Sequence, residues 1–539
     1  MRLPSFLGVL TVACLLYLPA PAAWAQAGLA ADAELVEMRT EVPKLKAPAE
    51  YSYKDGVVDI ELSEYAGYAG LIAANGGLDP SEESVFFKKN NFKVRIKLSE
   101  QESWSALNSG RLAASATTAD VLAVYGRQFE VTVPLLIGFS RGADGIVVRS
   151  EIKRLNDLKG KVVSLCQFTE SDFLLRYLSQ EAGLGVTMLP DLAAKPDPDK
   201  LNVVFCSDAF GAGDIFLRDL KAGRTRLAGC VTWEPKTSDV LKGAEGKARL
   251  LVSNRNLLVV ADVLVVNKGF AKAHADLVQA LVSGWLEGNH KVRAEPDKYL
   301  DVVAKAFKWD RDKAKNELAK VHLANLPENL AFYNGTIDSA GSFGYIYETA
   351  AYVYGEGLLG KPLTPAERFP DLAALKAIEK AGTFKDQKAS IEPIRAAGAG
   401  KAEIDVLKDL PILSKDIRFF FTPNSSKLDP AAKENAPGLE AIAQVLKVSP
   451  GSMVLLRGHA DGSQIEKFRK EGGEAKVREM RLALKNLSKA RCEEIKNILG
   501  EKFKMDPARV EFQGVGADEP TGKGPDADRR VEVQWFTVE

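Results

Sequence analysis

The sequence predicts an α/β protein that consists of a large unit followed by a smaller α/β unit. Strand-like and helix-like segments alternate from Tyr51 onward, and a second alternating set begins near Gly145. Residues 383–414 interrupt the pattern with an Ala-, Gly- and Pro-containing connector, after which residues 415–539 form a compact set of strands and helices. Strands that alternate with helices indicate a mostly parallel, doubly wound sheet in the large unit.

The elements of the large unit follow from hydrophobic periodicity. The predicted strands are Val57–Leu62, Phe92–Leu98, Val162–Cys166, Val203–Cys206 and Leu227–Val231, and Leu257–Val266 is a long apolar run. Helices are expected after Trp104, over Asp172–Ala182 and around Leu277–Trp285. Residues 295–382 have mainly helical periodicity.

Composition limits the classes of function. The chain has 539 residues, which is more than one domain usually holds. Hydrophobic residues make up 46% and charged residues 27%, a balance typical of folded domains and not of disordered chains. The 72 Lys and Arg equal the 72 Asp and Glu, so the basic excess of most nucleic-acid binders is missing and no nucleic-acid partner is expected.

The N-terminus predicts export. Arg2, the apolar stretch Phe6–Leu18 and the small-x-small sequence Ala23–Ala25 are typical of a signal peptide over residues 1–25, with residues 26–50 as an N-terminal arm. The alternative is acylation at Cys14, which would leave Leu15–Ala25 on the mature chain. No later apolar run reaches the ~18 residues of a membrane span, so we expect a soluble mature chain in the periplasm.

The cysteines and histidines do not indicate a metal site or a catalytic site. Cys206 and Cys230 end predicted strands, so a disulfide is an option if those strands are neighbours, and buried free thiols are the alternative. The four histidines lack metal-ligand spacing, so no metal and no cofactor is expected. No Ser/His/Asp or Cys/His set is evident, so the sequence predicts a protein that is not an enzyme.

Ordered short motifs over residues 53–360 resemble periplasmic substrate-binding proteins of the nitrate/sulfonate/thiamine-precursor type. They are Tyr68…Asn75-Gly76-Gly77, Phe92–Val94, Asn108–Gly110, Ile152–Val163, Phe168–Asp172, Leu220–Gly223 and Val231–Pro235. The resemblance implies a two-lobed fold over residues 51–382 that closes on a small-molecule solute. We expect the hinge near residues 140–146 and 255–264. A permease of an ABC-type uptake or sensing system is the implied membrane partner.

In such folds, loops after the strands contact the ligand. The expected ligand-binding residues are Tyr65, Thr118, Asp120, Thr169, Ser171, Trp233 and Glu234. Each also has a structural interpretation. Thr169 or Ser171 could cap a helix, Trp233 could pack in the core, and Glu234 could pair with a lysine.

The charge of the solute stays open between two classes. Carboxylates in a cleft would repel an anion, and several lie near the predicted loops. These are Glu64, Asp120, Asp208, Glu170 and Asp172. They favour a cationic or zwitterionic solute as much as an oxyanion.

The smaller unit contains Gly458-His459-x-Asp461, Leu487-Ser488-x-x-Arg491, Gly514-x-Gly516-x-x-x-Pro520 and Arg529-Arg530-Val531-Glu532-Val533. In this order they resemble the OmpA-like peptidoglycan-binding domain, a small α/β sandwich. The resemblance implies that Asp461 and Arg491 hold the diaminopimelate of the stem peptide. Arg530 is also expected to bind peptidoglycan, and it forms a second basic pair with Arg529, in which one arginine is expected to be structural. The sequence departs from the family at Leu484, where asparagine is usual, and in the Lys- and Glu-rich insertion 464–485.

Local patterns place the elements of this unit. Ile417–Thr422 and Met453–Arg457 are predicted strands, and a helix is expected to begin at Ser488 as its cap. Together the two resemblances predict a wall-anchored solute-binding protein. The alternative is an envelope structural protein whose large unit docks a protein partner.

Overall fold

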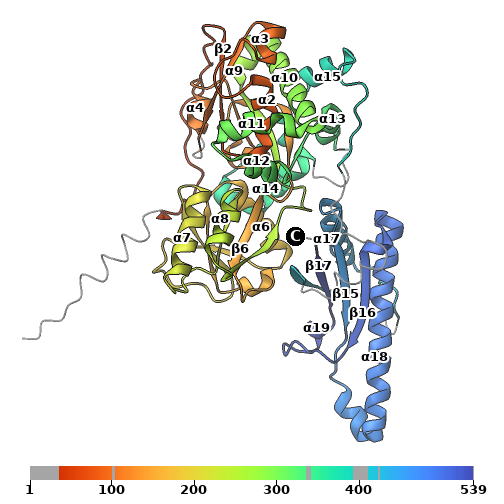
Figure 1. Ribbon diagram of the computed structural model, residues 1–539. Coiled ribbons are helices and arrows are strands. Elements are labelled where there is room, and N and C mark those ends of the chain that lie inside the picture. The colour runs from red at the N-terminus through yellow and green to blue at the C-terminus, as the bar shows by residue number, and fades with distance from the viewer. Residues whose placement is uncertain (1–34, 100–102, 336–341, 392–410, 423–424, 538–539) are drawn as a thin grey trace, which may run out of the picture.

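The computed structural model describes residues 35–99, 103–335, 342–391, 411–422 and 425–537. The predicted signal peptide and its alternative at Cys14 lie outside these residues. Two stacked α/β lobes are followed by a separate C-terminal domain, which lies beside the lower lobe (Figure 1). Within the described residues, no helix combines the length and the apolar character that a membrane crossing needs.

The first lobe, the upper one in Figure 1, is built on a six-stranded sheet with the order β13-β5-β12-β4-β2-β3. The strands are β2 (Val57–Leu62), β3 (Lys93–Leu98), β4 (Ala114–Thr118), β5 (Val131–Ser140), β12 (Ala261–Asn267) and β13 (Val321–Leu323). The surrounding helices are α2 (Ala69–Asn75), α3 (Val85–Asn90), α4 (Trp104–Asn108), α5 (Val121–Tyr125), α9 (Lys268–Ala273), α10 (Ala275–Ala294), α11 (Pro296–Phe307), α12 (Arg311–Leu318), α13 (Leu326–Asn334) and α15 (Ala373–Lys380). All ten residues of β5 are buried, as its continuous apolar sequence requires.

The second lobe has a seven-stranded sheet with the order β1-β9-β7-β10-β6-β11, with β8 also paired to β9. The strands are β1 (Leu35–Val36), β6 (Asp144–Arg149), β7 (Val162–Cys166), β8 (Val186–Met188), β9 (Leu201–Cys206), β10 (Gly229–Trp233) and β11 (Ala248–Ser253). Its helices are α6 (Glu170–Glu181), α7 (Ala209–Lys221) and α8 (Lys236–Gly243). The helix α14 (Phe343–Leu359) packs on α5 of the first lobe and on α6 of the second.

The chain crosses between the lobes at two neighbouring places. Residues 141–143 join β5 to β6, and residues 254–260 join β11 to β12, where the sequence analysis expects the hinge. The crossing strands run antiparallel to their neighbours, β12 beside β4 and β6 beside β10. The expectation of a mostly parallel sheet is therefore wrong for the first lobe, because three of its five strand pairings, β13 with β5, β5 with β12 and β12 with β4, are antiparallel.

The described part of the N-terminal arm is hydrogen-bonded to both lobes. β1 pairs with β9 of the second lobe, and the Arg39 backbone exchanges hydrogen bonds of 2.8 and 2.7 Å with the Gln167 side chain. Further along, Gln128 of the first lobe donates to the Pro43 carbonyl at 2.7 Å. The arm thus extends from the second lobe to the first and contacts both.

The strand order bears on the disulfide that the sequence left open between Cys206 and Cys230. Because β7 lies between β9 and β10, Cys206 and Cys230 are not on neighbouring strands. Cys166, Cys206, Cys230 and Cys492 are all free thiols.

The C-terminal domain is a four-stranded sheet covered by two helices. The strand order is β14-β17-β15-β16, with β14 (Leu413–Ile417), β15 (Met453–His459), β16 (Val510–Gly516) and β17 (Val531–Phe536). The helices are α17 (Asn435–Val448) and the long α18 (Ile465–Phe503), with the short α19 (Pro525–Asp528) before β17.

Two local predictions for this domain are wrong. The first strand ends at Ile417 and does not begin there, because its partner β17 begins at Val531 and the two residues are paired. Ser488 does not cap a helix, because the insertion is helical and continues into the predicted helix as α18. The only non-helical residues inside α18 are Gly472 and Gly473. The Ser488 hydroxyl instead donates to the Lys485 carbonyl and accepts from the Gly516 amide at 3.1 Å.

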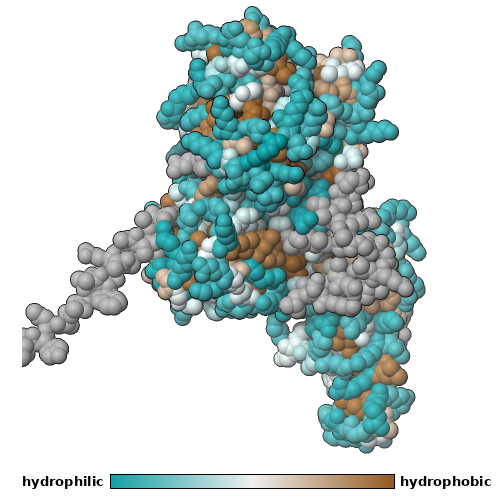
Figure 2. Space-filling view, in the orientation of Figure 1, coloured by the Kyte–Doolittle hydropathy of each residue, from teal (hydrophilic) through white to brown (hydrophobic). Residues whose placement is uncertain are grey.

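The C-terminal domain rests on the second lobe and on one crossing. The Asn156 side chain and the Ser414 backbone exchange two hydrogen bonds of 2.8 Å, and the Leu155 amide donates to the Ile412 carbonyl at 2.7 Å. On the crossing, the Leu258 amide donates to the Val448 carbonyl at 3.0 Å. Hydrophobic residues gather on the side of the lower lobe that faces this domain (Figure 2), and buried residues of both parts form one hydrophobic cluster.

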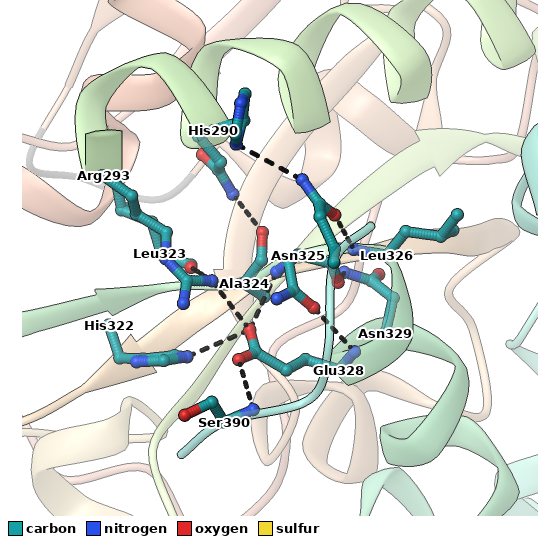
Figure 3. A network of polar contacts seen from close by, with 12 residues as sticks. His290, Arg293, His322, Leu323, Ala324, Asn325, Leu326, Glu328, Asn329 and Ser390 are labelled. Carbon is teal, nitrogen blue, oxygen red and sulfur yellow. Dashed lines mark hydrogen bonds and ion pairs between the residues drawn. The ribbon is translucent and has the colours of Figure 1, made fainter. Parts of the chain in front are cut away.

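A polar network fixes the segment that precedes the connector to the first lobe (Figure 3). Its centre is the buried Glu328 on α13, whose carboxylate accepts from Arg293 at 3.2 Å and from the Ser390 amide at 3.2 Å and lies 3.0 Å from His322 Nε2. Burial alone would raise the pKa of Glu328, but the hydrogen bond and charge of His322, with the charge of Arg293, hold it below its usual range. The network therefore favours the ionised carboxylate in the folded chain.

We expect Asn156→Ala to loosen the docking of the C-terminal domain, because it leaves both backbone groups of Ser414 without their partner, a loss of about 1–3 kcal/mol. Hydrogen exchange should become faster at the amides of β14 and stay unchanged in β2 and β3. Asn334→Ala, at an exposed position of α13, is the control. Unchanged exchange at Ser414 would contradict the docking.

Glu328→Gln should lower the free energy of unfolding by about 1–3 kcal/mol at pH 7, since the Arg293 guanidinium loses its anionic partner. The folded-state pKa is depressed, so this stabilisation is present above the ordinary carboxyl pKa and is lost as pH falls through the folded value. Urea unfolding at pH 7 and pH 3 should show a difference between wild type and variant that shrinks in acid. Exposed Glu348→Gln should show no such difference.

Candidate functional site

A cavity of about 630 Å³ of empty space, partly open to solvent, lies where the lobes and the crossings meet. It is lined by Glu61, Leu62, Ser63, Tyr65, Tyr68, Ser99, Trp104, Ser115, Ala116, Thr117 and Thr118 of the first lobe, by Ser140, Val260 and Asp262 on or beside the crossing strands, and by Asp144, Glu170 and Trp233 of the second lobe.

Two carboxylates on the crossing strands dominate the cavity. Asp144 is the first residue of β6, opposite Trp233 of β10, and Asp262 lies near the start of β12, opposite Thr118 of β4. Each is only 3% exposed. Burial raises the pKa of Asp144 to about 6 and holds the pKa of Asp262 well above its ordinary value.

The partners of these two carboxylates are few. Asp144 Oδ2 accepts from the Asn254 side chain at 2.9 Å, and Asp262 Oδ1 accepts from the Tyr68 hydroxyl at 3.3 Å. The Tyr65 hydroxyl is near enough to lower the pKa of Asp262 in part, but it lies outside hydrogen-bond geometry. Asp262 Oδ2 has no hydrogen-bond partner among the described residues.

Aromatic rings form the walls beside these acids. Tyr65 and Tyr68 meet edge to face, with ring centroids 5.2 Å apart. On the second lobe, Trp233 contacts Phe210 with centroids 5.8 Å apart, and its indole nitrogen is buried without a hydrogen-bond partner in the described chain. The cavity therefore combines acidic oxygens with aromatic faces.

The predicted ligand residues divide into two groups. Tyr65, Thr118 and Trp233 line the cavity, as expected for positions at or just after the ends of strands. Asp120 is fully buried and is absent from the described lining, although burial raises its pKa to about 7. It lies behind the cavity, close enough for its charge to act on Asp262.

The other three predicted residues have structural contacts. The Thr169 hydroxyl donates to the Cys166 carbonyl at 3.0 Å in the turn before α6, and Ser171 is fully buried inside that helix. Glu234 accepts from Lys320 of the first lobe at 2.7 Å and from Ser238 at 2.8 Å. The interpretation that Glu234 pairs with a lysine therefore describes this structure, and the pair bridges the lobes.

Most of the carboxylates expected near the cleft have other partners. Asp172 pairs with Arg176 at 2.7 Å, Asp208 caps α7 by accepting from Gly211 at 2.8 Å, and Glu64 accepts from Trp309 at 2.6 Å. Glu170 does line the cavity. The acidic character comes mainly from Asp144 and Asp262, which the sequence analysis missed. The available signal was an acidic residue inside an apolar run, as Asp262 is within Leu257–Val266.

A second cavity, a groove of about 840 Å³ of empty space, lies in the C-terminal domain. Its lining includes Arg418, Phe421, Arg491, Arg529 and Arg530. The Arg491 guanidinium lies over the Phe421 ring, 4.6 Å from its centroid, and donates to the Ser425 carbonyl at 3.2 Å. This face therefore offers arginine donors to an anionic group.

The other predicted residues of this domain lie close to the groove. Asp461 is paired with Arg529 at 3.7 Å and accepts from the Ser463 amide at 2.9 Å. Arg530 donates to Asp416 at 3.1 Å, as expected if one arginine of the pair is structural. His459, Glu519 and Glu532 place possible metal ligands within 4.8 Å of one another, but Arg457 already donates to both glutamates.

Comparisons with known proteins agree with this division. Residues 81–299 match the family model described as NMT1/THI5 like, and residues 420–533 match the model of the OmpA family. The chain thus contains a region that matches the NMT1/THI5-like model within its two lobes, followed by a region that matches the OmpA model in its C-terminal domain. Both resemblances found in the sequence are confirmed. A search of curated proteins returns no match to the chain.

Solved structures similar to the chain include two binding proteins. The periplasmic aliphatic sulphonate binding protein SsuA from Escherichia coli is 16% identical with a TM-score of 0.43, over 58% of this chain and 97% of that one. The periplasmic nitrate-binding protein NrtA from Synechocystis PCC 6803 is 12% identical with a TM-score of 0.44, over 64% of this chain and 92% of that one.

Proposed function

We propose that this protein is a non-enzymatic, wall-anchored periplasmic solute-binding protein. Its two lobes capture a small solute, and its C-terminal domain binds peptidoglycan non-covalently. The single observation that carries the proposal is the cavity between the lobes, where several buried polar atoms, among them Asp262 Oδ2 and the Trp233 indole nitrogen, lack hydrogen-bond partners among the described residues. Buried polar groups normally have hydrogen-bond partners, so a ligand that supplies them would explain this arrangement.

The architecture supports capture by closure. The lobes are joined by two adjacent crossings, and the cavity lining comes from both lobes and both crossings. A rotation about the crossings would therefore change the separation of Tyr65 from Trp233 and open or close the cavity. We infer delivery to an ABC-type permease from the class of the large domain.

The C-terminal domain supports anchoring. The proposed ligand is the diaminopimelate of the stem peptide, which carries an ammonium group and carboxylates. Arg491 in the groove would accept a carboxylate, and Asp461 at its rim would accept hydrogen bonds from the ammonium in exchange for its contact with Arg529. Export to a periplasm that holds peptidoglycan fits the predicted signal peptide.

A thermal-shift screen of small solutes should give at least one stabilising ligand. A solute at 100 times its dissociation constant stabilises by about 2.7 kcal/mol. Thr118→Val should reduce that shift, because it removes a hydroxyl at the cavity, whereas Thr187→Val on the remote strand β8 should not. A screen without any stabilising solute would favour the alternative of a docking module.

The full-length mature chain should co-sediment with diaminopimelate-containing peptidoglycan. Arg491→Ala and Asp461→Ala should each weaken this binding by about 1.5–3 kcal/mol, since each removes one side of a charge-assisted contact. Arg478→Ala on the exposed face of α18 is the matched control. Equal sedimentation of all three variants, with circular dichroism unchanged, would exclude the proposed contacts.

A further inference from the structure

We propose that the cleft is selective for a small organic cation, a solute that carries an ammonium or guanidinium group. This inference rests on the proposed solute-binding function and names the class of its ligand. The geometry points to Asp144 and Asp262 as the two acceptors for the positive group. Neither residue was expected from the sequence.

The charge of the cavity wall is the first argument. Among its described lining residues, Glu61, Asp144, Glu170 and Asp262 carry carboxyl groups and none carries a lysine, arginine or histidine side chain. Glu61 is already paired with Lys97 at 2.9 Å. An anion would oppose the ionisation of Asp144 and Asp262, whereas a cation would favour their ionised form and be attracted by it.

The unpartnered acceptor is the second and independent argument. Asp262 is 97% shielded from solvent, lines the cavity, and leaves Oδ2 without a hydrogen-bond partner in the described chain. Burying a carboxyl oxygen in this way is unfavourable unless a partner supplies hydrogen bonds. A ligand N–H donor is the partner that this oxygen lacks.

The surrounding side chains favour an organic cation over a metal ion. In the described parts of the chain, the only group of three metal-ligating side chains within 4.8 Å is His459, Glu519 and Glu532 in the C-terminal domain. The cleft instead places Tyr65 and Trp233 beside its acids. Aromatic faces attract alkylammonium and guanidinium groups, so rings and carboxylates together fit such a ligand.

The proposal predicts the direction in which the affinity for the solute changes with pH. Burial raises the pKa of Asp144 to about 6, and the charges that act on Asp144 and Asp262 from neighbouring elements include those of Glu234, Asp120 and each other. The phenols of Tyr65 and Tyr68 also face Asp262. A bound cation favours the ionised carboxylates, so binding releases protons and should tighten as pH rises from 5.5 to 7.5. Binding of an anion would show the opposite dependence.

The test is calorimetry of the full-length mature protein with charge-matched probes. The cations are putrescine, agmatine and choline, and the anions are nitrate, ethanesulfonate and butanesulfonate. We expect at least one cation to bind, with an affinity that rises several-fold from pH 5.5 to 7.5. Asp262→Asn and Asp144→Asn should each weaken it at least tenfold, while Asp239→Asn on the exposed side of α8 should leave it unchanged.

The possible outcomes separate the cation proposal from the proposed function. If an anion binds and the two asparagine variants bind it equally or more tightly, the cation class is wrong and solute binding stands. If no probe of either charge binds the wild type, the cation class is also wrong. The proposal of solute binding is itself contradicted only if, in addition, no solute in the wider thermal-shift screen stabilises the protein. The comparison of cations with anions uses the wild-type protein alone, so the test remains valid even if a variant fails to fold.

Discussion

The two adjacent crossings of the chain between the lobes are the constraint on which the rest of this structure depends. They force β5, β6, β11 and β12 to run antiparallel to their neighbours and so set the mixed topology of both sheets. They also bring Asp144 and Asp262, which are more than a hundred residues apart, to one cavity. The second crossing additionally contacts the C-terminal domain through Leu258 and Val448.

The cleft contains buried acids that are unfavourable for stability. Asp120, Asp144 and Asp262 are buried close to one another, and burial raises the pKa of each. A purely structural core would place apolar side chains or paired charges there, as the chain does with Asp172 and Arg176. The retention of incompletely paired acids between two lobes is the feature on which the proposal of a binding site depends.

The position of the C-terminal domain ties anchoring to the geometry of the large domain. Its first strand is hydrogen-bonded to the second lobe through Asn156 and Ser414, while the Glu328 network fixes the preceding segment to the first lobe. The chain that leaves the large domain is therefore held at one lobe before the connector and at the other lobe after it. A domain held at the wall in this way would present the cleft in a defined orientation.

The sequence by itself determined the local elements, the division into a large and a small α/β part, and the family of each. Strands such as Val57–Leu62 and Val162–Cys166 follow directly from periodicity, and the ordered motifs around Asp461 and Arg491 suffice for the second family. Tyr65, Thr118 and Trp233 could be predicted because they lie at or just after the ends of strands, which the local sequence pattern locates.

The tertiary structure alone decided which acids meet in the cleft. Asp172, Asp208 and Asp262 look alike in sequence, but the first pairs with Arg176, the second caps α7 and only the third faces the cavity. The sequence also could not show that Glu234 is paired with Lys320 of the other lobe, or that the insertion continues into α18. Partners of a charged side chain are set by contacts between distant segments, and no pattern of neighbouring residues contains that information.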